Sequence, residues 1–159
     1  MSVIYTIGFT KRKIKDFRNE LKNNNIDYII DIRENTNSTL FWFAKKDILK
    51  YIANLHNIWY LHWPFLAPSK KLRRTYWKQL CRLYDKKTKQ EEAKYVFWLY
   101  KKQYIQETNF NLIDVDFLKK NKCVLLCSEH MPTFCHRKIV SDYLEKNYWF
   151  KTMHLFITK

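Results

Sequence analysis

The sequence predicts a single α/β domain over residues 1–159, with a mostly parallel, twisted sheet of about five strands and helices on both faces. Short runs rich in β-branched and aromatic residues alternate with segments whose apolar residues recur every three or four positions. Some runs are apolar at nearly every position, as in strands covered on both faces. The fold is Rossmann-like, but with one glycine the chain has neither GxGxxG nor GxxxxGKS/T, which argues against a standard dinucleotide site or P-loop.

The first strand is the run VIYTI, which Gly8 closes. A helix follows, because apolar residues recur at Ile14, Phe17 and Leu21 before three asparagines end it. DYIIDIR, at residues 27–33, is nearly continuously apolar at its centre and predicts a buried second strand.

Residues 46–57 predict a second amphipathic helix, with Ile48, Ile52 and Leu55 facing inward. The run WYLHW after it is rich in aromatic residues and predicts a third strand. Pro64 stops this strand, because proline has no backbone N–H to continue a ladder of hydrogen bonds.

The second half of the chain predicts two basic helices, at about residues 71–86 and 91–106. CVLLC, at residues 123–127, is entirely apolar and predicts a fourth strand covered on both faces. A helix over residues 135–146 and a strand near residues 152–157 complete the alternation.

Ligands of parallel sheets bind outside the carboxyl ends of the strands. Four such ends can be read from the sequence: Gly8-Phe9-Thr10, Asp31-Ile32-Arg33, Trp63-Pro64 and Cys127-Ser128-Glu129. The predicted architecture brings these distant segments to one rim, and we place the candidate site there.

The net charge is the strongest global signal, since 30 Lys and Arg against 15 Asp and Glu give +15. Residues 69–104 hold 12 basic and three acidic residues, so more than half of the excess lies in a basic helical insertion at about residues 70–106. This imbalance predicts a nucleic acid or nucleotide partner, with a solvated helix pair as the alternative. The expected nucleic-acid surface consists of Lys70, Lys71, Arg73, Arg74, Lys78 and Arg82.

The amino terminus MSVIYTIGF has no basic leader, and 18 apolar residues never occur together. We therefore expect a soluble, cytoplasmic protein without a membrane partner. Thiols stay reduced in that compartment, so the cysteines are interpreted as chemistry or core before disulfides.

The stretch CVLLCSEHMPTFCHR holds three of the four cysteines. In a strand, Cys123 and Cys127 are about 13 Å apart, too far to share one zinc ion. Cys127, Cys135 and a histidine form an incomplete zinc set, so no metal or cofactor is predicted, although a divalent ion stays open. Cys127 and Cys135 could also form a redox pair, but they lack CxxC spacing. Cys81 and Cys123 are expected in the core.

Two carboxylates follow strands, Asp31 and Glu129, and a pair on one rim could act as acid and base, or as nucleophile and stabiliser. His136 and Arg137 fall in the first turn of the helix that begins near Cys135, where free backbone N–H groups favour an anion. The guanidinium of Arg137 adds a fork that suits phosphate or carboxylate.

Six blocks occur in order along the chain: YTIGFT, DIRENTNS, FAK, HWPFLAP, LLCSE and CHR. In this order they resemble the domain-of-unknown-function family 488, in the branch that begins with YTIGFT. The resemblance covers nearly the whole chain, and it implies membership of a family whose activity is unassigned. The positions that match its motifs are Gly8, Thr10, Asp31, Arg33, Asn35, Ser38, His62, Cys127, Glu129, Cys135, His136 and Arg137.

Two positions depart from the pattern of that branch. Phe65 stands where a glutamate usually follows the proline, and Trp42 stands where a small residue precedes Phe43. The resemblance therefore implies either a changed substrate or a loss of activity in this member.

Our leading hypothesis is a nucleic-acid-associated or nucleotide-acting enzyme that hydrolyses a glycosidic or phosphate-ester bond at the rim. The expected catalytic residues are Asp31, Glu129 and His136. The expected substrate-binding and phosphate-binding residues are Gly8, Thr10, Arg33, Asn35, Ser38, His62, Cys127, Cys135 and Arg137.

Two alternatives stay open. In the first, the protein is a non-catalytic nucleic-acid-binding module in which Trp59, Trp63, Trp77 or Trp98 stacks on bases. In the second, it is a thiol-redox or metal-binding protein centred on Cys127 and Cys135.

Overall fold

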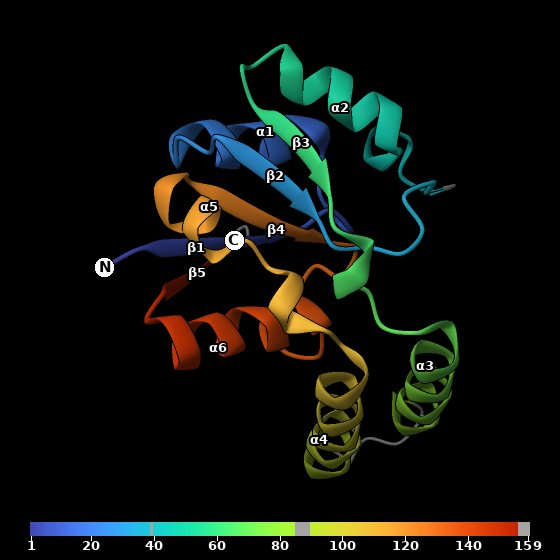
Figure 1. Cartoon of the computed structure of the whole chain (residues 1–159). Helices are drawn as coiled ribbons and strands as arrows, with labels where there is room; N and C mark the ends of the chain where they lie inside the picture. Colours follow the sequence, from blue (N-terminus) through green and yellow to red (C-terminus); the bar gives the residue numbers. More distant parts are fainter. Residues whose placement is uncertain (39, 85–89, 156–159) are drawn as a thin grey trace.

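One parallel sheet of five strands forms the centre of the protein (Figure 1). The structure, a computed structural model, describes residues 1–38, 40–84 and 90–155. Its strands are β1 (Val3–Gly8), β2 (Tyr28–Asp31), β3 (Trp59–His62), β4 (Cys123–Cys127) and β5 (Lys151–Leu155). Their order is β3-β2-β4-β1-β5, and each neighbouring pair is parallel. The predicted α/β class with a parallel sheet is confirmed.

Helices connect the strands on both sides of the sheet. The α-helices are α1 (Ile14–Asn23), α2 (Lys46–Asn54), α3 (Lys70–Tyr84), α4 (Gln90–Glu107), α5 (Val115–Lys120) and α6 (His136–Tyr148). Single 3-10 turns are η1 (Trp42–Ala44), η2 (Pro64–Leu66) and η3 (Phe110–Leu112). In the described part of the chain, no helix has both the length and the apolar composition needed to cross a membrane.

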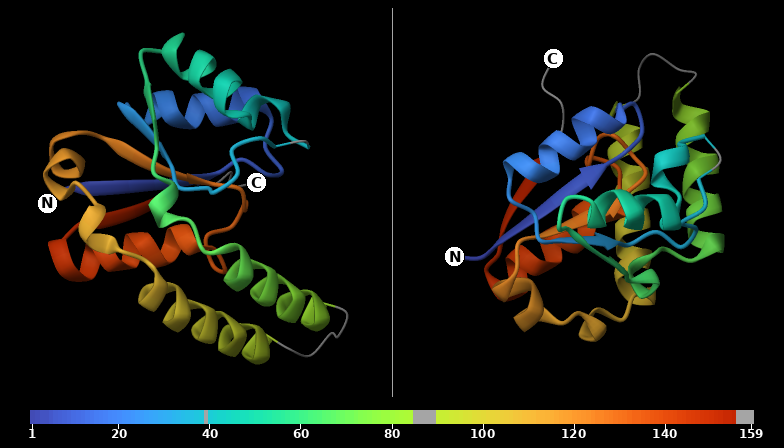
Figure 2. Two further views of the ribbon diagram at one scale, coloured as in Figure 1. Left: turned by 45° about the vertical axis from the view of Figure 1, so that its right-hand side comes forward. Right: turned by 90° about the horizontal axis from the view of Figure 1, so that it is seen from above.

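The sheet separates two hydrophobic cores. Helices α1 and α2 cover one face, where Phe17 and Leu49 pack with Ile29, Val124 and other strand residues. Helix α6 covers the other face, beside α5 and the α3–α4 pair (Figure 2). All five residues of β4 are buried, because this strand lies in the middle of the sheet with helices on both sides. This double cover explains why CVLLC has no polar positions.

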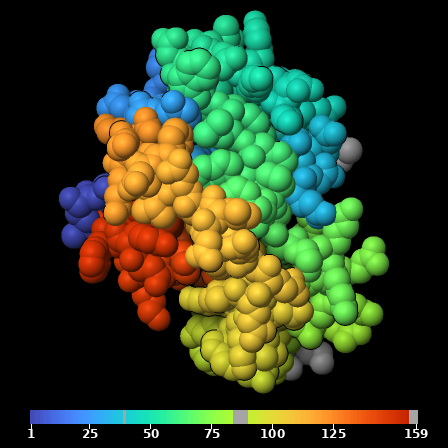
Figure 3. All heavy atoms as spheres, in the orientation of Figure 1, coloured from blue at the N-terminus to red at the C-terminus, as the bar shows by residue number. Residues whose placement is uncertain are grey.

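Helices α3 and α4 run side by side and extend beyond the carboxyl edge of the sheet, where they protrude in the space-filling view (Figures 2 and 3). Tyr76 of α3 stacks on Tyr100 of α4, with ring centroids 4.2 Å apart. The hydroxyl of Tyr76 donates to the carbonyl of Phe134 at 2.9 Å, and that of Tyr104 donates to Leu66 at 2.6 Å. These bonds attach the helix pair to the rim.

Two sequence expectations about side-chain placement need correction, and one helix was not predicted. Leu55 is 61% exposed, because α2 turns Leu49 and Ala53 toward the sheet. Cys81 is exposed, since Leu80 beside it takes the inward position of α3. Helix α5 was not predicted; it is a single short helix whose start is capped by Asp114.

Some predicted positions lie outside the described residues: Asp85, Lys86, Lys87 and Lys89 of the basic segment, and Ile157 of the last strand. Both basic helices are present on either side of that gap, close to their predicted bounds.

Gly8 ends β1 at a point where the backbone of the loop after β4 and the side chain of Arg137 both approach it closely. A Cβ at this position would overlap the carbonyl group of Glu129 and would lie 2.5 Å from Nη1 of Arg137. The amide of Thr10 then donates to the carbonyl of Ser128 at 3.0 Å, so the two loops are bonded to each other. The absent side chain of Gly8 is therefore what lets the loop after β4 close onto β1.

Replacement of Gly8 by alanine should destabilise the protein by about 3 kcal/mol or more, because backbone and a buried guanidinium would have to move. Urea or thermal denaturation followed by circular dichroism would measure the loss. Thr10→Ala is the matched control, since only the backbone of Thr10 is used in the turn. Equal stability of Gly8→Ala and wild type would contradict the close packing described above.

Candidate functional site

The parallel register brings the predicted strand ends to one edge of the sheet. Gly8 pairs with Cys127 across β1 and β4, and Asp31 pairs with His62 across β2 and β3. Asp31 also pairs with Leu126, the residue before Cys127. Segments that are far apart in the sequence therefore meet at one rim, as predicted.

A cavity of about 60 Å³ opens at this rim between the sheet and the α3–α4 pair. Its lining residues are Arg33, Glu34, Asn35, Pro68, Arg73, Tyr76, Trp77, Tyr100, Cys127, Ser128, Glu129, Phe134, Cys135 and His136. The rim residues predicted from the sequence thus supply the floor. The sequence interpretation missed most of the walls, which are aromatic residues of α3, α4 and the loop before α6.

A larger hollow of about 440 Å³ adjoins the cavity. The two share Trp77, Ser128, Glu129 and Phe134 among their lining residues. Thr10 lines the larger hollow and not the inner cavity. The site therefore has a small inner end that holds the reactive side chains and a wider outer part that is open to solvent.

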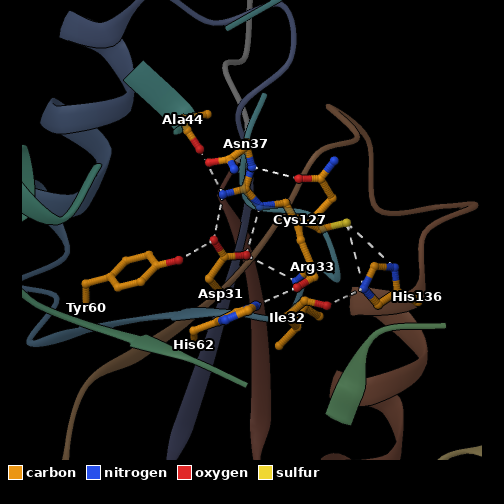
Figure 4. A network of polar contacts seen from close by, with 10 residues as sticks. Asp31, Ile32, Arg33, Asn37, Ala44, Tyr60, His62, Cys127 and His136 are labelled. Carbon is orange, nitrogen blue, oxygen red and sulfur yellow. Dashed lines mark hydrogen bonds and ion pairs between the residues drawn. The ribbon is translucent and has the colours of Figure 1, made fainter. Parts of the chain in front are cut away.

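Asp31 and Arg33 form a buried ion pair behind the cavity (Figure 4). Nε of Arg33 donates to Oδ1 of Asp31 at 2.8 Å, and Nη2 donates to Oδ2 at 2.6 Å. The backbone amide of Arg33 also donates to Oδ1, and Nη2 donates to the carbonyl of Ala44. Burial would lower the pKa of Arg33, but the hydrogen bonds and the charge of Asp31 raise it overall.

Tyr60 and His62 of β3 complete this network. The hydroxyl of Tyr60 donates to Oδ2 of Asp31 at 2.7 Å. Burial is the main cause that raises the pKa of Tyr60, and the negative charge of Asp31 raises it further. Nε2 of His62 lies 2.8 Å from the carbonyl oxygen of Arg33. Both oxygens of the fully buried Asp31 are thus occupied, so its carboxylate holds Arg33 and β3 in position.

Four titratable side chains form a second cluster on the cavity floor: Cys127, Glu129, Cys135 and His136. The thiols of Cys127 and Cys135 donate to Oε2 of Glu129 at 2.8 and 3.1 Å. Nδ1 of His136 lies 3.6 Å from Sγ of Cys127 and 4.0 Å from Sγ of Cys135. Nε2 of His136 lies 3.1 Å from the carbonyl oxygen of Ile32, to which it can donate (Figure 4).

The environment separates the proton affinities of these four groups. Burial raises the pKa of Glu129 to about 7, and the neighbouring Cys127 adds to this effect. Burial would also raise the pKa of Cys127, but hydrogen bonds from Cys135 and the charge of His136 lower it well below the ordinary value. Burial would lower the pKa of His136, yet Cys127 raises it to about 9. Near neutral pH, Glu129 is therefore the group poised to exchange a proton.

Cys127, Cys135 and His136 are also of the residue types that bind soft metal ions. Their Sγ and ring nitrogen atoms all lie within 4.8 Å of one another, and all three residues are buried. Cys127 ends β4, Cys135 is the residue before α6, and His136 is the first residue of α6. Regular secondary structure thus fixes all three positions.

Arg137 holds the loop that carries Glu129. Nη1 of its buried guanidinium donates to the carbonyl of Glu129, and Nη2 donates to that of His130 at 2.8 Å.

Two further predicted site residues, Asn35 and Ser38, make local bonds in the loop after β2. The side chain of Asn35 accepts a hydrogen bond from the backbone amide of Asn37, and Asn35 lines the cavity. The hydroxyl of Ser38 accepts one from the backbone amide of Phe41, and Ser38 does not line the cavity.

The two departures from the family pattern lie outside the lining of the inner cavity. Phe65 stacks on Trp63, with ring centroids 5.6 Å apart, and Trp42 is an exposed residue that meets Phe43 edge to face. Neither residue occurs among those that line the cavity or the adjoining hollow.

The fold and the site together define an α/β protein with two buried thiols, a buried imidazole and a half-buried carboxyl group clustered at the carboxyl ends of its strands. The chain belongs to the family described as Domain of unknown function DUF488, whose model matches residues 13–144. This match confirms the resemblance and spans every motif block except YTIGFT. No curated protein and no solved structure matches the chain.

Asp31→Asn should destabilise the protein by about 3–5 kcal/mol, because it leaves the buried guanidinium of Arg33 without its counter-charge. Tyr60→Phe removes one hydrogen bond to the same carboxylate and should cost about 1 kcal/mol. Urea denaturation of both variants measures the difference. Similar losses in the two variants would show that the charge of Asp31 is not what holds Arg33.

Glu129→Gln should alter how stability depends on pH. The raised pKa of Glu129 means that the folded protein binds this proton more tightly than the unfolded chain does. The stability that this proton adds to the folded protein is fully present below the ordinary glutamate pKa of about 4.3. It is lost as the pH rises through about 7, the pKa of Glu129 in the folded protein. Between about pH 5.5 and 8.5, wild type should therefore lose on the order of 2 kcal/mol relative to Glu129→Gln.

The comparison is made by urea denaturation in a buffer that contains a chelator, so that only protons bind the cluster. Glu107→Gln is the control, because Glu107 lies on the exposed surface of α4. A difference between wild type and Glu129→Gln that does not vary with pH would contradict a raised pKa at Glu129.

Proposed function

We propose that the protein is a hydrolase that acts on a nucleotide or on nucleic acid, with its reaction at the inner cavity. The observation that carries this proposal is the composition of the site. A half-buried carboxyl group lies at the floor, aromatic rings and an arginine form the walls, and a basic helix leads to the opening. This combination suits a substrate that has a planar base and a phosphate.

The dimensions of the site support a substrate of this kind. The inner cavity of about 60 Å³ has room for a reacting group and no more. The adjoining hollow of about 440 Å³ falls in the range of small-molecule sites and has room for a base and sugar. Trp77 lies at the boundary between the two spaces and is 37% exposed, so one face of its indole can stack on a base.

Basic residues of α3 supply the charge that a phosphate requires. Arg73 lines the inner cavity and lies 3.3 Å from Glu34, at a site that is open to solvent. Such an exposed ion pair contributes little, so a phosphate can replace the carboxylate at low cost. The other expected contacts of a polyanion are the exposed residues Lys70, Lys71, Arg74, Lys78 and Arg82.

Glu129 is the acid and base in this proposal. Its carboxylate takes a proton from the attacking water, and the same proton then passes to the leaving group, so no other co-reactant is needed. Asp31 serves as a positioning residue, because Arg33 and Tyr60 occupy both of its oxygens. The geometry therefore favours one acid–base carboxyl group over a reacting pair.

Binding of fluorescently labelled single- and double-stranded oligonucleotides across a salt series tests the polyanion part of the proposal. Several phosphate contacts predict a steep fall of the binding constant with salt, with a log-log slope of about −0.7 to −0.9 per contact. Reversal of charge at Lys71 and Arg74 should reduce that slope by about two contacts. A slope near zero would limit the substrate to free nucleotides.

Trp77→Ala should weaken binding of a nucleotide or oligonucleotide by about 1–3 kcal/mol, the value of one stacking contact. Trp98→Ala is the matched control, because Trp98 is exposed on α4 and does not line the inner cavity or the hollow. Equal effects of the two substitutions would argue against base stacking in the cavity.

The products are examined in the same samples. Glu129→Gln should abolish product formation while it leaves binding within about twofold of wild type, because the amide cannot accept the proton. Binding without product in wild type would favour a non-catalytic binding module. Product formation by Glu129→Gln at the wild-type rate would overturn the role of Glu129.

A further inference from the structure

We propose that Cys127, Cys135 and His136 bind a zinc ion, with Glu129 beside the fourth position of the metal. The inference rests first on distances. A tetrahedral zinc has Zn–S bonds of about 2.3 Å and Zn–N bonds of about 2.0–2.1 Å, so its ligand atoms are about 3.5–3.8 Å apart. Nδ1 of His136 lies 3.6 Å from the sulfur of Cys127 and 4.0 Å from that of Cys135. The three ligand atoms all lie within 4.8 Å of one another, so rotations of the side chains can bring them to these separations.

The orientation of His136 is a second, independent observation. Its Nε2 lies 3.1 Å from the carbonyl oxygen of Ile32, at the carboxyl end of β2. Histidines that bind metals usually donate from the other ring nitrogen to a carbonyl or carboxylate, as Nε2 does here when it carries a proton. Nδ1 is then the nitrogen that binds the metal. Nδ1 and Nε2 lie 3.6 and 3.9 Å from the sulfur of Cys127, so the imidazole ring must turn for the Nδ1 lone pair to point at the ion.

Charge and burial agree with a divalent ion. Two thiolates and one neutral imidazole carry a charge of −2, so a zinc ion would make the buried group neutral. A neutral group of this kind avoids the large cost of burying a net charge in a low-dielectric site. Binding releases to solvent the protons that the two sulfurs and Nδ1 of His136 carry, which balances the exchange.

Glu129 is placed beside the metal and not on it. Its Oε2 lies 2.8 and 3.1 Å from the two sulfurs. These distances are shorter than the separation of about 3.5–3.8 Å between two ligand atoms of one tetrahedral zinc. Zinc sites with three protein ligands keep the fourth position for water, and a nearby glutamate that is not a ligand can accept its proton. This part of the inference rests on the proposed hydrolysis, whereas the metal site itself does not.

Metal content is the primary test and needs no substrate. Wild-type protein, purified under reducing conditions and equilibrated with zinc before gel filtration, should contain about one zinc per chain. Replacement of zinc by cobalt should give the intense thiolate-to-cobalt charge-transfer band and the visible bands of a tetrahedral centre. Less than about 0.2 metal per chain, or octahedral cobalt bands, would overturn the proposal.

Variants identify the ligands. Cys127→Ser, Cys135→Ser and His136→Asn should each weaken zinc binding by more than the 10–100-fold that follows loss of a residue hydrogen-bonded to a metal ligand. Cys81→Ser is the control, because Cys81 is exposed on α3 and should leave zinc binding unchanged. Glu129→Gln should also retain zinc. Loss of zinc from Glu129→Gln would make the carboxylate a ligand and would overturn the three-ligand assignment.

Alkylation of the wild-type protein keeps the test independent of how the variants fold. Without zinc, iodoacetamide should label the exposed Cys81 quickly and the buried Cys127 and Cys135 slowly, from the cavity that they line. Zinc should slow labelling of Cys127 and Cys135 at least tenfold and leave Cys81 unaffected. Equal labelling with and without zinc would overturn the site. Because these readouts require no turnover, failure of the metal site is distinguishable from failure of the proposed hydrolysis.

Discussion

The close approach of the loop after β4 to Gly8 is the constraint on which the rest of the site depends. A peptide carbonyl stands where any other side chain would have to go, and Arg137 holds that carbonyl from α6. The loop cannot swing away from the sheet, so Cys127, Glu129 and Cys135 stay within hydrogen-bonding distance. The only glycine of the chain is therefore the residue whose missing side chain allows the packing that sets the geometry of the Cys127, Glu129 and Cys135 cluster.

The alternation of strand and helix patterns was sufficient to predict the fold class, because a strand that is apolar throughout requires cover on both faces. The parallel sheet then required the strand ends to meet, and the pairing of Gly8 with Cys127 shows that they do. Motif residues and strand ends coincide for a physical reason. Strand ends are the places where a rigid scaffold can present reactive groups to solvent.

Other features could not be predicted, because they depend on distances that only tertiary packing sets. A carboxylate after an apolar strand looks the same in sequence whether it lines a cavity, as Glu129 does, or is enclosed by an arginine, as Asp31 is. Helix phase is a similar case, since Leu55 and Leu49 both fit an apolar stripe and only contact with the sheet selects Leu49. The aromatic walls from α3 and α4 carried no pattern beyond that of ordinary core helices.

The protein divides its site between two structural parts. The sheet and the start of α6 supply the floor of the cavity. Helices α3 and α4 supply the walls, and they share the hydrophobic core of that face and bond to the rim through two tyrosine hydroxyls. The hydrogen bonds within the Cys127 and His136 cluster involve no residue of α3 or α4. Substitutions on the cavity side of these two helices would therefore reshape the space above the cluster while its internal bonds keep the same partners.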